Sequence, residues 1–138
     1  MPDSATPKLR EFARRALAYE AASGTRTDGT ASASYLVCEK LRGQLGKLIG
    51  IAGFRSLLSR ALALAGAEVP WLRALHIKSD GSLEGVDGLD TKLGPRTVAE
   101  GEVALVSQLV GLLVTFIGPA LTLRVLHDIW PDMDDFNL

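Results

Sequence analysis

Hydrophobic residues recur at intervals of three and four along three parts of this chain, which predicts amphipathic helices. The first part follows Thr6 and Pro7, an N-cap residue and a proline at the first helical position, and ends before Gly24. Residues 24–34 are rich in small polar side chains without a period, so they predict a flexible loop. The positions that follow this spacing and form one face of the first amphipathic helix are Leu9, Phe12, Ala13, Ala16, Leu17 and Glu20.

The second part, from about Tyr35 to Gly66, is interrupted by four glycines at intervals of three, four and three. A glycine inside a helix costs about 1 kcal/mol relative to alanine. Either the helix breaks near Gly50, therefore, or the glycines allow another helix to approach closely. The four glycines of this stripe are Gly43, Gly46, Gly50 and Gly53.

The third part contains twenty-one consecutive uncharged residues, Val103 to Leu123, about the length of a membrane-spanning helix. Thr97 and Glu100 have the spacing of a capping box, and Gly118-Pro119 must kink or end a helix. We therefore expect two helices, about 98–117 and 119–130, that form a central hydrophobic hairpin. One stripe of this hairpin carries small or polar residues, which are Gln108, Gly111, Thr115 and Gly118. This stripe should pack closely on another helix, and the glycine stripe of the second part is a candidate for that contact.

This stripe suits a lipid bilayer as well as a soluble core. Burying the polar Gln108 side chain in hydrocarbon costs free energy, and the break at Gly118-Pro119 shortens the continuous helix. The upstream flank carries Glu100 and Glu102 instead of the Lys and Arg clusters that orient a span. We therefore expect a buried hairpin in a soluble protein, with membrane association or insertion through residues 98–130 as the alternative.

Shorter elements fill the middle of the chain. Pro70 starts a turn that carries Trp71, and Asp80-Gly81 between short alternating segments predicts a β-hairpin with a two-residue turn. Residues 86–96 are expected to be a loop. The predicted fold is mainly α: a single-domain bundle of about five helices over residues 1–138, with a central hydrophobic helical hairpin and a small β-hairpin.

Charge and composition narrow the function classes. The chain is 47% hydrophobic and 22% charged, with a net charge of −1, which is typical of one globular domain. Up to Arg73 there are eleven Lys and Arg against six Asp and Glu, and afterwards four against ten. The basic side chains of the first helix have no interleaved aromatics, so they predict a solvated face and no nucleic-acid partner. A single cysteine and no visible signal peptide favour the cytoplasm.

No catalytic or metal motif is complete. Cys38 with His76 or His127 could form a thiol and base pair, but Cys38 lies among leucines and valine, as a buried inert thiol does. Asp80 begins a stretch spaced like a calcium loop, in which Thr91 replaces the essential bidentate glutamate. We therefore expect no catalytic residues, no metal and no cofactor.

The C-terminal segment is the most suggestive candidate for partner binding. Aromatic and methionine side chains recur there every three residues among aspartates, as in docking peptides. The alternative is that Trp130 seals the core and residues 131–138 fray. The candidate partner-binding residues are Trp130, Asp132, Met133, Asp134, Asp135 and Phe136.

Residues 37–65 and 103–132 resemble segments of small uncharacterised helical proteins of proteobacteria. This resemblance implies an intact bacterial protein of one domain and attaches no activity to it. We expect a non-enzymatic interaction or regulatory module that presents a helical groove or its acidic aromatic tail to a protein partner, with a homodimer as one form. The alternatives are a membrane-inserting protein and a carrier of an apolar small molecule or lipid.

Overall fold

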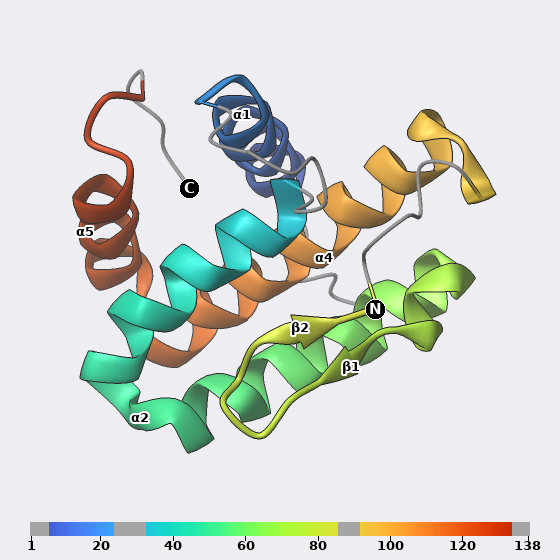
Figure 1. Cartoon of the computed structure of the whole chain (residues 1–138). Coiled ribbons are helices and arrows are strands. Elements are labelled where there is room, and N and C mark those ends of the chain that lie inside the picture. Colours follow the sequence, from blue (N-terminus) through green and yellow to red (C-terminus); the bar gives the residue numbers. More distant parts are fainter. Residues whose placement is uncertain (1–5, 24–32, 86–91, 134–138) are drawn as a thin grey trace.

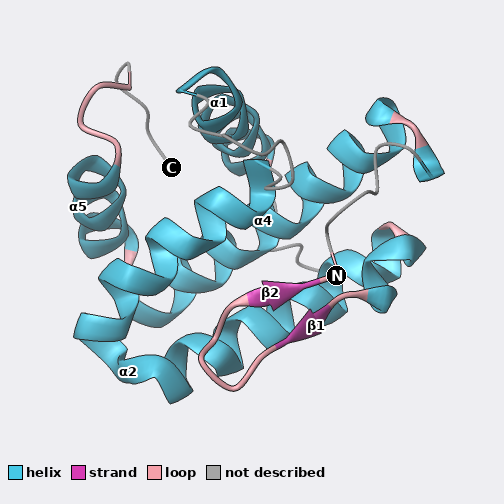
Figure 2. Ribbon diagram, viewed as in Figure 1, coloured by secondary structure: helices cyan, strands magenta, loops and turns pink. Residues whose placement is uncertain are grey.

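The computed structural model describes residues 6–23, 33–85 and 92–133, in which four helices, one short 3-10 helix and a two-stranded hairpin are formed (Figures 1 and 2). The predicted mainly α class is confirmed. One helix fewer is present than expected, because the second helix continues through its break. The elements are α1 Pro7–Ser23, α2 Ala33–Glu68, η1 Pro70–Ala74, β1 His76–Ile77, β2 Leu83–Glu84, α4 Pro95–Ile117 and α5 Pro119–Ile129.

Helix α4 is the central element of the fold. It contacts α1, α2 and α5, and Figure 1 shows it running beside the first half of α2. Every residue from Ala104 to Leu113 is buried, so neighbours cover this part of the helix on all sides. The rest of the uncharged run differs, because Thr115 and Phe116 are exposed. The run is therefore fully buried from Ala104 to Leu113 and only partly buried after it, where Phe116 is exposed but Thr122 is buried.

Helix α1 forms as the sequence predicts. The backbone N–H of Leu9 donates to the Thr6 hydroxyl at 3.3 Å, which satisfies one of the free amides at the helix start. The six predicted positions are all buried, including the carboxyl-bearing Glu20. Helix α2 begins at Ala33, so residues 33 and 34 of the expected loop belong to it, while 24–32 lie outside the described residues.

Three glycines set the ends and breaks of the long helices. Gly50 and Gly118 have φ values of 81° and 89° with extended ψ, a conformation that is essentially restricted to glycine. The break near Gly50 and the break at Gly118-Pro119 are thus confirmed. The capping-box prediction is wrong: α4 begins at Pro95 after Gly94, and no side chain caps it. Proline suits the first helical position because its φ is already fixed there.

The β-hairpin is confirmed, but its turn is longer than expected. The backbone N–H of Lys78 donates to the Ser82 carbonyl at 2.8 Å, and that of Gly81 donates to the Lys78 carbonyl at 2.9 Å. Three residues, not two, therefore lie between the paired positions, and Gly81 takes the positive φ that such a loop requires. The Asp80 carboxylate accepts hydrogen bonds from the Ser82 amide at 2.9 Å and hydroxyl at 2.6 Å.

The expected close contact between the two small-residue stripes is wrong. A Cβ added at Gly43, Gly50 or Gly118 would meet no atom within 4 Å, so none of these glycines is pressed against a second helix. A Cβ at Gly46 or Gly53 would meet only isoleucine side chains of α2 itself. On the other stripe Gln108 and Gly111 are buried, whereas Thr115 is exposed. Gly50 makes the break in α2, and none of the four glycines packs closely on a second helix.

We predict opposite effects for alanine at two of these glycines. Gly43→Ala should raise the free energy of unfolding by about 0.5–1 kcal/mol, because the site is open and helical. Gly50→Ala should lower it by about 1–3 kcal/mol, because alanine does not tolerate the backbone angles there. Urea unfolding followed by circular dichroism measures both. Destabilisation by Gly43→Ala would restore the packing interpretation.

Candidate functional site

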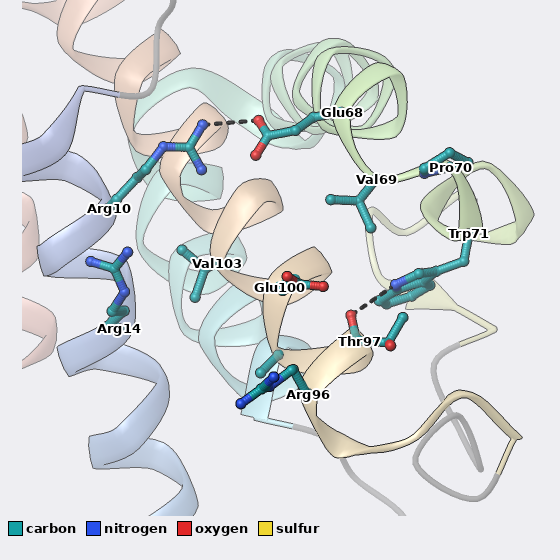
Figure 3. A pocket seen from close by; sticks show the side chains of 11 residues that line it. Arg10, Arg14, Glu68, Val69, Pro70, Trp71, Arg96, Thr97, Glu100 and Val103 are labelled. Carbon is teal, nitrogen blue, oxygen red and sulfur yellow. Dashed lines mark hydrogen bonds and ion pairs between the residues drawn. The ribbon is translucent and has the colours of Figure 1, made fainter.

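An open hollow of about 930 Å³ lies between α1, the junction of α2 with η1, and the first turns of α4 (Figure 3). We call it the arginine groove. Its wall combines charged side chains with the apolar surfaces of two valines, an alanine, a proline and a tryptophan. The residues that line it are Arg10, Arg14, Glu68, Val69, Pro70, Trp71, Arg96, Thr97, Ala99, Glu100 and Val103.

Trp71 is the fixed wall of this groove. Its indole N–H donates to the backbone carbonyl of Thr97 at 3.1 Å, and its ring is half-buried against α4. The ring lies directly over Gly101, where an added Cβ would be 2.3 Å from the Trp71 ring. Only glycine at this position lets the tryptophan approach α4 so closely. The contact holds η1 and the start of α4 together.

The charges of the groove are positive in balance. Three arginines and two glutamates line it, and the Arg10 guanidinium donates to the Glu68 carboxylate at 2.9 Å. Arg14 is 3.6 Å from Glu11, one turn earlier on α1, and its side chain is 58% exposed. Figure 3 shows Arg14 on α1 at the left, Arg96 at the start of α4 below the centre, and Trp71 at the right. Two exposed arginines, Arg14 and Arg96, thus border the hollow beside the apolar side chains of Val103 and Trp71.

Trp130, which the sequence suggested as a partner-binding side chain of the C-terminal segment, is not exposed to a partner. Trp130 is fully buried, its ring meets Phe12 edge to face with centroids 5.9 Å apart, and its indole N–H donates to the Glu20 carboxylate at 2.8 Å. Its assignment as a partner-binding residue is therefore wrong, because the side chain closes the core. Asp132 is exposed and Met133 packs partly on the core, while Asp134, Asp135 and Phe136 lie outside the described residues.

Glu20 is the buried acidic side chain next to Trp130. Its carboxylate is buried, and the Lys40 ammonium lies 2.6 Å away as a second partner. The Lys40 side chain is partly exposed, so water screens the ion pair on one side. A carboxylate buried with two donors is a satisfied structural group, and it joins α1, α2 and the end of α5.

Cys38 is buried as expected. Burial raises the pKa of its thiol to about 12, and the nearby carboxylates of Glu39 and Glu102 act in the same direction. A thiol with such a pKa stays protonated at neutral pH and is a poor nucleophile. Both histidines are on the surface. Within the described ranges, no three His, Cys, Asp or Glu side chains are grouped to hold a metal ion.

The groove could not be found from the sequence, because its walls come from separate parts of the chain. The sequence predicted that Trp71 lies in a turn, but it did not predict that the Trp71 ring packs on α4. Gly101, inside the apolar face of a strongly predicted helix, was the one usable signal. Comparisons of the chain with protein-family models, curated proteins and solved structures found no match. The resemblance to proteobacterial helical proteins therefore stays a prediction.

Proposed function

We propose that this chain is a non-enzymatic interaction module that binds a segment of a partner protein in the arginine groove. The observation that carries the proposal is the fixed Trp71 wall facing arginines across an open hollow. Tryptophan and arginine are the side chains that most often dominate protein interfaces. Here the tryptophan is held in place before a partner arrives, which lowers the entropy cost of binding.

The composition of the groove favours one kind of ligand. Arg14 and Arg96 can each bind a carboxylate with two parallel hydrogen bonds, while Val69, Val103 and the Trp71 ring offer apolar contact. A polypeptide segment with an acidic side chain close to an apolar one meets both demands. The groove is open and partly charged, which suits such a segment better than an apolar small molecule or lipid.

The absence of catalysis is part of the proposal and is supported by Cys38. Catalysis by a cysteine nucleophile needs an accessible thiolate beside a base, whereas the Cys38 thiol is buried and held in its protonated form. The arginine groove contains no cysteine or histidine among its lining residues. Its arginines can bind and orient a carboxylate, but they are too basic to transfer protons at neutral pH.

Peptide display against the whole chain tests the proposal. The selected peptides should carry adjacent acidic and apolar residues, and the double variant Arg14→Ser with Arg96→Ser should weaken their binding by about tenfold or more, because charge-assisted hydrogen bonds are lost. Arg60→Ser is the matched control, since Arg60 is an exposed arginine that does not line the groove. Peptides that bind the double variant and the control equally well would overturn the groove as the binding site.

A further inference from the structure

The two helix breaks lie at one end of the molecule. In Figure 1 the bend of α2 and the junction of α4 with α5 are both at the lower left. Leu48 of α2 shares a small hollow of about 310 Å³ with Leu121 of α5, which confirms that these segments are neighbours. Gly50 bends α2 and Gly118 separates α4 from α5, so the chain changes direction at both positions.

This end exposes large apolar side chains. Phe116 is 62% exposed, Leu48 48%, and Ile51 and Leu121 38% each. We call these four residues the apolar tip. They make up four of the six large hydrophobic side chains that are exposed in the described part of the chain. Soluble proteins seldom gather apolar surface in this way unless the surface binds something.

Charge around the apolar tip points to an anionic occupant. No acidic residue occurs in 40–67 or in 103–127. The exposed cations next to the tip residues along the chain are Lys47, Arg55 and Arg124. Two acids lie near them: Asp128 on the shared hollow, and Asp80 in the hairpin turn, where Gly81 lies against the Arg55 side chain. A second copy docked tip to tip would bring these cations face to face, which opposes a symmetric dimer. An anionic surface would instead attract them.

The structure also limits how deeply this end can enter a membrane. By length and composition, α2 and α4 could each cross a bilayer. However, α2 is interrupted at Gly50, and 56% of the most apolar window of α4 is buried inside the protein. Exposed apolar corners with flanking cations are the features of a protein that rests on the lipid surface, with side chains at the boundary between headgroups and acyl chains.

We propose that the apolar tip docks the protein on the surface of an anionic lipid bilayer. Phe116, Leu121 and the α2 corner enter the interface, and Lys47, Arg55 and Arg124 contact the lipid phosphates. The arginine groove is at the other end of α4, since Thr97 and Phe116 are separated by about 30 Å at 1.5 Å per helical residue. The groove therefore stays accessible on the docked protein, and this inference is independent of the function proposed for it.

Co-sedimentation of the whole chain with lipid vesicles tests this inference. One vesicle preparation is pure phosphatidylcholine, and the other contains about one third phosphatidylglycerol. We expect binding to the second that weakens with added salt. Phe116→Ser combined with Leu121→Ser should lower the partition coefficient by about tenfold or more. Lys47→Gln and Arg124→Gln should each lower it by about fivefold, because a cation near an anionic surface contributes about that factor.

Leu64→Ser is the matched control, because Leu64 lies on the same helix as Ile51, is equally exposed and is about 20 Å away along the axis. Unchanged urea midpoints show that each variant is folded. The proposal is overturned if the Phe116 and Leu121 variant binds as well as the control, if both vesicle types bind equally, or if neither binds. The proposal is also overturned if the chain forms a homodimer that dissociates in the Phe116 and Leu121 variant, because the apolar tip would then bind a second copy of the chain.

Discussion

Replacing Trp130 with alanine is expected to lower the free energy of unfolding by about 3–5 kcal/mol, the usual cost of removing a fully buried aromatic side chain. The loss combines the cavity, the edge-to-face contact with Phe12 and the hydrogen bond to the buried Glu20 carboxylate. Small domains are stable by only about 5–15 kcal/mol, so the variant should be close to unfolding at room temperature. Urea denaturation followed by circular dichroism measures the difference.

Trp71→Ala is the control for this result. Both tryptophans donate one indole hydrogen bond, but Trp71 is only half-buried, so its removal should cost clearly less stability. If Trp130→Ala instead leaves stability unchanged, Trp130 does not close the core, and the C-terminal segment regains its role as a docking peptide.

A second large effect is expected at the centre of α4. Leu109 is completely buried, and Leu109→Ala should lower the free energy of unfolding by about 2–5 kcal/mol through lost apolar contact and an unfilled cavity. Phe116→Ala lies two turns later in the same uncharged run, yet it should change stability by only about 0.5 kcal/mol, because most of its ring already faces solvent.

Local chemistry made parts of the fold predictable from the sequence. The α1 face was correct residue by residue because one helix period and one N-cap define it. The breaks at Gly50 and Gly118 were correct because glycine and proline act through the backbone of their own positions. The capping box failed because Pro95, two residues before Thr97, offers the helix an earlier start.

Tertiary contacts decided what the sequence left open. The uncharged run is hydrophobic along its whole length, so the sequence does not show where its burial ends. The positions of α1, α2 and α5 determine that the fully buried part of α4 ends at Leu113. The glycine periodicity of α2 matched the stripe on α4, but matching periods do not bring two surfaces together. The groove depends on the contact of Trp71 with Gly101, which is thirty positions away, and the local sequence around either residue does not predict this contact.

The uncharged run changes surroundings midway: its first half is buried in the core of the fold, and its second half is only partly buried, with Phe116 on the surface. The most direct test is the difference in unfolding free energy between Leu109→Ala and Phe116→Ala, measured in urea without detergent. We predict that Leu109→Ala costs at least about 2 kcal/mol more. Equal costs at the two positions, or a chain that unfolds cooperatively only in detergent, would show that Leu109 and Phe116 do not differ in burial in this way.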